Sequence, residues 1–371
     1  MIGAPRNEIG QEMRNDLAGK GTARAKRVLL VRLGSMGDVL HGLPTLVTLK
    51  ESFPEWEVDW LVERRWRELL QDNPYLSRLM EFSTLEWRHS PFSADTWRKI
   101  REGTAQLRQR QYDYALDLQG AMKSAVACRM SGAAQVIGLA RPWVRESAAS
   151  VFYSRRVPSD AEHIVEANLA LAEALGAAQP VIRFPLPPGD DAAVPTGMRN
   201  RSFVVMNPGA GWAAKQWPVS AYAELCDELE SRHALPAILN CGPGETALAE
   251  AVSSRCRRAK PLTFSGNLPG LIALLRRAKL MIGPDTGPLH LAAALAVPTV
   301  ALFGPTDPRR NGPYGNANRT LRPEGAVTSH RRTGRSDGGM ERIRPSQVLE
   351  AIRELTEEES KLPAKTGTAA S

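Results

Sequence analysis

The sequence has few cysteines, few aromatic residues and no long apolar run. Its four cysteines stand apart in 371 residues, with no Cys-x-x-Cys pair. This pattern is typical of reduced thiols in a cytosolic protein and indicates neither a disulfide framework nor a zinc site. Charged residues or proline interrupt every apolar stretch before about eighteen residues, so we expect no transmembrane helix. Residues 1–25 contain no apolar core of a secretion signal and are predicted to be a disordered tail.

Several catalytic signatures are also missing. There is no Gly-x-Gly-x-x-Gly fingerprint, no nucleotide-hydrolase phosphate loop, no Gly-x-Ser-x-Gly elbow and no His/Cys cluster with metal spacing. We therefore favour chemistry that needs no metal and no cofactor. A nucleotide-binding oxidoreductase stays open as a less favoured alternative. A nucleic-acid partner is not expected, because aromatic residues at 6% are too sparse for a base-stacking groove.

The net charge of +8 is concentrated in two segments. Residues 308–344 contain nine arginines against three acidic residues, and residues 122–156 contain six basic residues against one acid. Each segment either contacts an anionic partner, such as phosphate, nucleic acid or anionic lipid, or is an ordinary solvated surface. The role of residues 308–344 is left open.

Apolar runs alternate with helical patterns from residue 27 onward, which predicts βαβ units and parallel sheets. This alternation of strand and helix patterns stops at a proline-rich stretch and resumes after it. The predicted fold class is therefore α/β, with two facing Rossmann-like domains and a central cleft. The predicted boundaries are an N-terminal domain at 26–184, a linker at 185–200, a C-terminal domain at 201–344, a helix at 345–356 and a disordered tail at 357–371. Strands are expected at 27–33, 58–62, 114–118, 136–139, 202–206, 237–241, 280–282 and 299–303.

The first loop that carries chemistry follows the first strand and reads GSMGDVLH from residue 34. Its small residues let a ligand approach the backbone where a helix begins. Asp38 is either a helix-capping acid or a general base held in the cleft. His41 lies one turn after Gly37 and either points the same way or is structural.

The C-terminal half has two comparable loops and one isolated acid. A glycine-rich turn containing Ala210, Gly211 and Lys215 suits a phosphate oxygen, or is an ordinary loop with an exposed lysine. Glu245 either binds ribose hydroxyls or starts a helix. The loop from residue 283 offers amides at a helix N-terminus and polar groups for sugar hydroxyls, through Asp285, Thr286, Gly287 and His290. Capping by the acid and a core position for the histidine are the alternatives there.

Together these motifs resemble the bacterial ADP-heptose:lipopolysaccharide heptosyltransferases, glycosyltransferase family nine. The resemblance spans about residues 26–356 and rests on VLLVRLGSMGDVLHGLPTL, NPGAGWAAKQWP, GPDTGPLHLAAALAVPTVALFGPTDP and MERIRPSQVLEAI. The first loop is most similar to that of the heptosyltransferase I subfamily. The resemblance implies a GT-B fold and an inverting, metal-independent transfer of heptose from ADP-heptose to the Kdo of Kdo-lipid A. A family-nine transferase with another nucleotide sugar or acceptor is the alternative.

The resemblance also implies roles for residues. Asp38 is the expected catalytic base, and the donor is expected to contact Lys215, Glu245, Asp285, Thr286, Gly287, His290, Ala210 and Gly211. The acceptor is expected to contact Ser35, Met36, Gly37, His41, Lys123, Arg141 and Arg145. A lipid acceptor further implies a cytoplasmic enzyme with transient contact to the inner leaflet of the inner membrane, through basic surfaces and no anchor.

Overall fold

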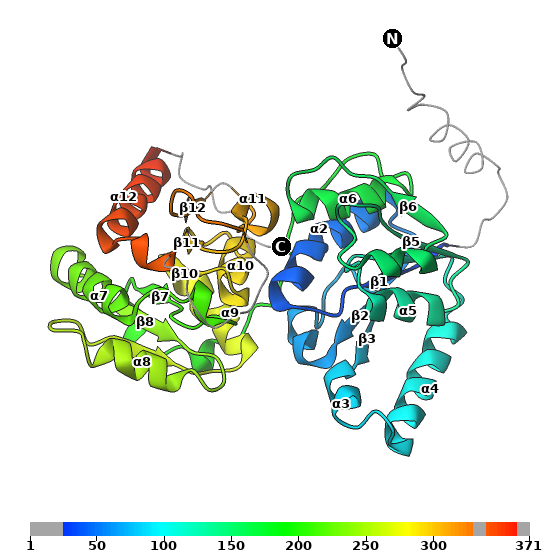
Figure 1. Ribbon diagram of the computed structural model, residues 1–371, viewed down its shortest axis with the longest axis horizontal. Coiled ribbons are helices and arrows are strands. Elements are labelled where there is room, and N and C mark those ends of the chain that lie inside the picture. Colours follow the sequence, from blue (N-terminus) through cyan, green and yellow to red (C-terminus); the bar gives the residue numbers. More distant parts are fainter. Residues whose placement is uncertain (1–24, 316, 329–338, 362–371) are drawn as a thin grey trace, which may run out of the picture. The chain divides into compact units, whose positions relative to one another are not determined.

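The computed structural model describes residues 25–315, 317–328 and 339–361 (Figure 1). The chain divides into two compact units between Pro187 and Pro188, and each unit contains one six-stranded sheet. Residues 1–24 and 362–371, which belong to the predicted tails, lie outside the described residues. No helix within the described ranges is long and apolar enough to cross a bilayer.

The sheet of the first unit has the strand order β3-β2-β1-β4-β5-β6, and all its strand pairs are parallel. This is the order of a doubly wound Rossmann sheet, whose winding reverses between β1 and β4. The strands are β1 (Arg27–Val31), β2 (Glu57–Glu63), β3 (Arg78–Phe82), β4 (Tyr114–Asp117), β5 (Gln135–Leu139) and β6 (Arg155–Val157).

The sheet of the second unit repeats this topology, with the order β12-β11-β10-β7-β8-β9 and parallel pairs throughout. Its winding reverses between β7 and β10. Loops after these two strands therefore leave the sheet where ligands bind in open α/β folds. The strands are β7 (Val204–Met206), β8 (Ala237–Asn240), β9 (Leu262–Phe264), β10 (Leu280–Pro284), β11 (Thr299–Leu302) and β12 (Asn318–Leu321).

α-Helices follow most of the strands in both units (Figure 1). In the first unit they are α2 (Met36–Ser52), α3 (Thr84–His89), α4 (Ala94–Gln109), α5 (Met122–Met130) and α6 (Ile164–Glu173). In the second they are α7 (Val219–His233), α8 (Thr246–Ser253), α9 (Leu268–Arg277), α10 (Gly287–Ala294), α11 (Pro308–Asn311) and α12 (Pro345–Lys361). Because the central strands are covered on both faces, they are almost wholly apolar.

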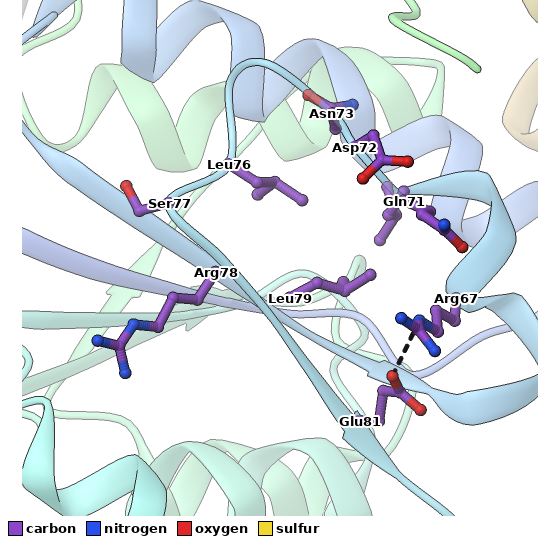
Figure 2. Close-up of a pocket in the computed structure, with 10 residues that line it drawn as sticks. Arg67, Gln71, Asp72, Asn73, Leu76, Ser77, Arg78, Leu79 and Glu81 are labelled. Atoms are coloured by element: carbon purple, nitrogen blue, oxygen red, sulfur yellow. Dashed lines mark ion pairs between the residues drawn. The ribbon is translucent and has the colours of Figure 1, made fainter. Parts of the chain in front are cut away.

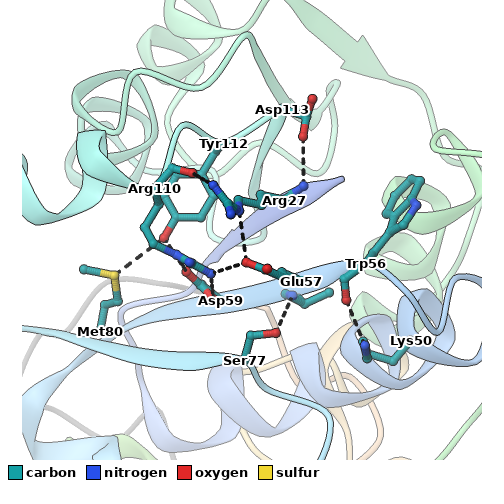
Figure 3. A network of polar contacts seen from close by, with 11 residues as sticks. Arg27, Lys50, Trp56, Glu57, Asp59, Ser77, Met80, Arg110, Tyr112 and Asp113 are labelled. Carbon is teal, nitrogen blue, oxygen red and sulfur yellow. Dashed lines mark hydrogen bonds and ion pairs between the residues drawn. The ribbon is translucent and has the colours of Figure 1, made fainter. Parts of the chain in front are cut away.

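A charged network stands at the amino-terminal side of the first sheet (Figure 3). The fully buried Asp59 accepts hydrogen bonds from Arg110 Nε at 2.8 Å and from the Tyr112 hydroxyl at 2.7 Å. Glu57 is held between Arg27 and Arg110, at 3.0 and 2.7 Å. The network ties the end of α4 to β2 and is structural, because a buried carboxylate requires such partners.

The eight interior strands are predicted by the sequence, and the four strands it does not predict are β3, β6, β9 and β12, which are the sheet edges. The C-terminal helix α12 runs to Lys361 and not to residue 356 as predicted. Residues 188–200, predicted as part of a linker, belong to the second unit. They pack on α9 through the ion pair between Arg277 and Asp191, 2.7 Å.

Candidate functional site

The first loop leaves β1 at the point where the sheet order reverses and leads directly into α2. Its backbone approaches Trp66 closely, because a Cβ built on Gly34 would lie 2.6 Å from the indole nitrogen. Gly34 also has a φ of +148°, which favours glycine. The loop therefore needs this glycine, against which the Trp66 indole packs.

Asp38 is partly buried in the first turn of α2, and both of its oxygens are engaged. Oδ1 lies 2.6 Å from the Arg32 guanidinium, and Oδ2 accepts from the Ser35 N–H at 2.8 Å and hydroxyl at 3.1 Å. Burial raises the pKa of Asp38, but the charge of Arg32 and the Ser35 hydrogen bonds outweigh it and hold the pKa below its usual value. The carboxylate is therefore ionised at neutral pH and able to accept a proton.

Arg32 is a site residue that the sequence analysis did not identify. It is 4% exposed and directs its guanidinium at Asp38. In the sequence it stands at the end of an apolar run and is indistinguishable from the last residue of a strand. The pairing of a buried cation with an acid six residues later was the only available signal.

Lys123, Arg141 and Arg145, which are also predicted to contact the acceptor, lie in the two connections that follow β4 and β5. Lys123 is in the first turn of α5, after β4, and Arg141 follows β5, where it donates to the Ser147 hydroxyl at 2.6 Å. The backbone of Arg145 lies against Gly120, since a Cβ there would be 2.9 Å from the Arg145 nitrogen. The structure thus brings the loops after β4 and β5 together.

His41 has a different environment from the rest of its loop. It is 4% exposed, and its ring meets the ring of His163 edge to face, with centroids 5.4 Å apart. Its backbone carbonyl accepts from Asn168 Nδ2 in α6. This placement is that of a packed helix residue, and its contact with an acceptor stays a prediction.

In the second unit, Lys215 and Asp285 form a partly buried ion pair across the loops after β7 and β10. Lys215 Nζ lies 2.6 Å from Asp285 Oδ2 and 3.2 Å from the Asp285 carbonyl oxygen. The other carboxylate oxygen lies 2.9 Å from His290 Nε2. Although burial opposes ionisation, His290 and Lys215 hold the pKa of Asp285 well below its usual range. The site therefore carries a fixed negative charge next to a fixed cation.

The N-terminus of α10 lies beside this pair. Thr286 is the N-cap residue, and its hydroxyl donates to the Pro284 carbonyl at 3.1 Å, so it does not cap the helix. The helix then begins with Gly287. Amides in a first helical turn have no acceptor within the helix, and the helix dipole favours an anion there. Lys215 and this turn together bring a cation and the amino end of a helix to one place.

Glu245 lies against the loop that contains Ala210 and Gly211. It accepts from the Gly242 N–H at 2.8 Å, and its carboxylate fills the space beside Gly209, where a Cβ would lie 2.2 Å from the carboxylate atoms. Glycine at residue 209 is thus required for this contact. The loops after β7 and β8 are joined beneath it by two buried amide side chains, Asn207 and Asn240, 2.6 Å apart.

Within the part of the chain that the structure describes, no group of three or more His, Cys, Asp or Glu side chains has the geometry of a metal site. A polar cavity of about 260 Å³ lies between Arg64–Leu69 and β3 (Figure 2). Arg67 and Glu81 pair across it at 3.1 Å. None of the predicted site residues lines this cavity. A second cavity, near Lys123, is apolar.

The comparisons with known proteins identify the family of this chain. The family model "Glycosyltransferase family 9 (heptosyltransferase)" matches residues 100–337. The chain belongs to this family and is a glycosyltransferase, so the resemblance seen in its sequence is confirmed.

Individual relatives are similar over most of their length. The chain is 32% identical to "Lipopolysaccharide heptosyltransferase 1" of Pseudomonas aeruginosa over 78% of this chain and 82% of that protein. The structure "E. coli heptosyltransferase WaaC with ADP" matches with a TM-score of 0.75 and 27% identity, covering 89% of this chain and 99% of that one. WaaC "with ADP-2-deoxy-2-fluoro heptose" matches with a TM-score of 0.72 and 27% identity, over 88% and 99%. The predicted α/β fold of the GT-B type is confirmed.

Proposed function

We propose that this chain transfers heptose from ADP-heptose to the Kdo of the lipopolysaccharide inner core, with Kdo-lipid A as the acceptor. The observation that carries the proposal is the division of charge between the two sheets. One sheet presents an ionised carboxylate at its reversal point, and the other presents a cation beside a helix N-terminus. These are the groups that deprotonating an acceptor and holding a diphosphate require.

The donor site is assigned to the second unit. An ammonium group has three N–H donors, and Lys215 directs two of them at Asp285, which leaves one for a phosphate oxygen. The amides of Thr286 and Gly287 add the favourable end of the α10 dipole. Neutralisation of the leaving diphosphate thus comes from the protein itself, and neither a metal nor another cofactor is assigned a role.

The remaining donor contacts follow from the surrounding loops. Asp285 holds Lys215 and, with His290, offers polar groups to sugar hydroxyls. The carboxylate of Glu245 suits the ribose hydroxyls of the nucleotide. The backbone of Ala210 and Gly211 lies in the same loop, where the lack of large side chains lets the donor approach.

The acceptor site is assigned to the first unit, with Asp38 as the catalytic base. The acceptor hydroxyl gives its proton to Asp38 as its oxygen bonds to the anomeric carbon. The carbon–oxygen bond to the diphosphate breaks, ADP leaves with the electron pair, and the anomeric configuration is inverted. Arg32 holds the base in place before the acceptor binds.

The acceptor is anionic, and the basic loops of the first unit complement it. Ser35, Met36 and Gly37 border the base, and His41 follows one turn later. Lys123, Arg141 and Arg145 are proposed to contact acceptor carboxylates or phosphates. A lipid acceptor places the enzyme in the cytoplasm, with transient contact to the inner leaflet.

The test is a transfer assay with ADP-heptose and Kdo-lipid A, using mass spectrometry of the product and NMR of its anomeric configuration. Asp38→Asn keeps the size of the side chain but removes the base, so we expect kcat to fall by about 10²–10⁴-fold. Asp113→Asn is the matched control, because Asp113 pairs with Lys26 beside the amino end of β4. Normal turnover by Asp38→Asn would refute the assignment of the base. Transfer of a different sugar would be compatible with the proposed mechanism but would contradict heptose as the sugar transferred.

A further inference from the structure

The segment from α3 to the start of α4 carries a cluster of exposed apolar side chains. Leu85, Phe92 and Trp97 are 40%, 93% and 57% exposed. They are three of the seven large apolar side chains that are exposed in the described ranges, and they fall within thirteen residues of sequence. A concentrated apolar surface of this kind usually marks a binding site.

Behind this surface lies an apolar cavity of about 440 Å³. Leu85 and Trp97 line it as well as being exposed, so the surface and the cavity are continuous. A volume of this size is within the usual range of ligand pockets, about 300–1,000 Å³. Its remaining apolar walls come from β3, α3, α4 and α5, through Phe82, Trp87, Ile100, Val126, Ala127 and Met130.

Polar groups occupy only part of the cavity wall. Arg65 and Lys123 supply positive charge, and Glu63 is already engaged by the Thr84 hydroxyl at 2.6 Å. Trp87 Nε1 is buried and has no hydrogen-bond acceptor among the residues that the structure describes. The cavity therefore combines apolar walls with cationic groups and an indole N–H, which complements an alkyl chain joined to an anionic group.

The cavity lies on the same sheet edge as the proposed acceptor site. Glu63 and Phe82 are the last residues of β2 and β3, and Lys123 follows β4 in the first turn of α5. Asp38 follows β1, the neighbour of β2 and β4. Because the carboxyl ends of parallel strands meet at one edge, the cavity and the loop of the base lie on the same edge of the sheet.

We propose that Leu85, Phe92 and Trp97 form a bilayer-docking surface, and that an acyl chain of the bilayer enters the cavity behind them. The proposal rests on the proposed function, since a lipid acceptor must be presented from a membrane. Aromatic side chains are favourable at the level of lipid headgroups. Arg98 and Lys99 are paired with acids on α4, so these two cations add no net charge beside the apolar side chains.

Vesicle flotation of the full chain tests the docking surface, with vesicles of phosphatidylethanolamine and phosphatidylglycerol. The double variant Phe92→Ser/Trp97→Ser should bind more weakly by at least about tenfold, because two large apolar side chains are removed from the interface. Val151→Ser is the matched control, because Val151 is 72% exposed elsewhere in the same unit. Equal binding of the double variant and the wild type would overturn the proposal.

Two further measurements test how the lipid is bound and whether its acyl chain enters the cavity. Most wild-type binding should survive about 0.5 M salt, which screens exposed charges; complete loss would show binding by basic residues alone. Val126→Phe, which fills part of the cavity, should reduce quenching of tryptophan fluorescence by acyl-brominated lipids. Unchanged quenching at an unchanged melting temperature would exclude an acyl chain from the cavity.

Transfer assays with two acceptors distinguish a failure of the docking surface from a failure of the proposed function. The double variant should lose transfer to Kdo-lipid A in vesicles but keep transfer to a water-soluble Kdo glycoside that has no acyl chains. Equal loss on both acceptors would contradict a docking role. If the wild type transfers to neither acceptor, the proposed function fails, while the flotation result still decides the docking surface.

Discussion

Substitution of Lys215 by methionine tests the proposed donor site through two independent quantities. The Lys215 and Asp285 side chains are only 15% and 10% exposed and lie 2.6 Å apart. Methionine keeps most of the volume of the side chain and removes its charge. Loss of a charge-assisted hydrogen bond to phosphate should weaken ADP binding by about ten- to a hundredfold.

The same substitution should lower the free energy of unfolding by about 2 kcal/mol at pH 7, because Asp285 loses its lysine partner and keeps the contact with His290 Nε2. The pKa of Asp285 is lowered in the folded protein, so its stabilisation is present above the unfolded pKa and is lost as pH falls through the folded one. Without Lys215 this lowering is smaller. The difference in stability between wild type and variant should therefore shrink below about pH 4.

Calorimetric titration with ADP and urea unfolding at neutral and acidic pH measure these effects. Lys279→Met is the matched control, because Lys279 is exposed and precedes β10 at the opposite edge of the same sheet. It should change neither quantity by more than about 0.5 kcal/mol. Unchanged ADP affinity in Lys215→Met would refute the donor-site reasoning, even if the variant were destabilised.

Three further substitutions probe the two sites and the core. Gly209→Ala should displace Glu245 and weaken ADP binding about tenfold by calorimetry, with little change for inorganic phosphate; normal ADP affinity would count against the ribose contact. Arg32→Met should raise the pKa of Asp38 and move the acidic limb of the kcat/KM profile toward neutral pH; an unmoved limb would show that another group sets it. Arg110→Met should cost about 3 kcal/mol in urea unfolding, because it strips a partner from a buried carboxylate; a loss below about 1 kcal/mol would show that the tyrosine hydroxyl suffices.

The interior strands were predictable because both of their faces are covered, and they read as short apolar runs. Each of the four edge strands pairs with a neighbouring strand on one side only and is less covered by other elements. β6 reads RRV and β12 reads NRTL, which an apolar pattern does not identify. Their positions depend on pairing with a neighbouring strand rather than on their own hydrophobicity.

The loops of the site were predictable as loops, but their contacts were not. Lys215 and Asp285 are 70 residues apart and meet because β7 and β10 are neighbours, which depends on the strand order of the whole sheet. The Arg32–Asp38 pair requires a bend between strand and helix that spacing does not reveal. The helical spacing of His41 allows its side chain to face the loop. The same spacing is also compatible with packing against α6, and the sequence does not distinguish the two.

The most direct test of the central claim is calorimetric titration of the wild-type chain with ADP-heptose, ADP-glucose, UDP-glucose and NAD in the presence of EDTA. ADP-heptose should bind with EDTA present and should bind more tightly than the other three ligands. Binding that requires a divalent cation would contradict the assignment of diphosphate neutralisation to Lys215 and the α10 N-terminus. Failure of ADP-heptose to bind under either condition would contradict the proposed donor.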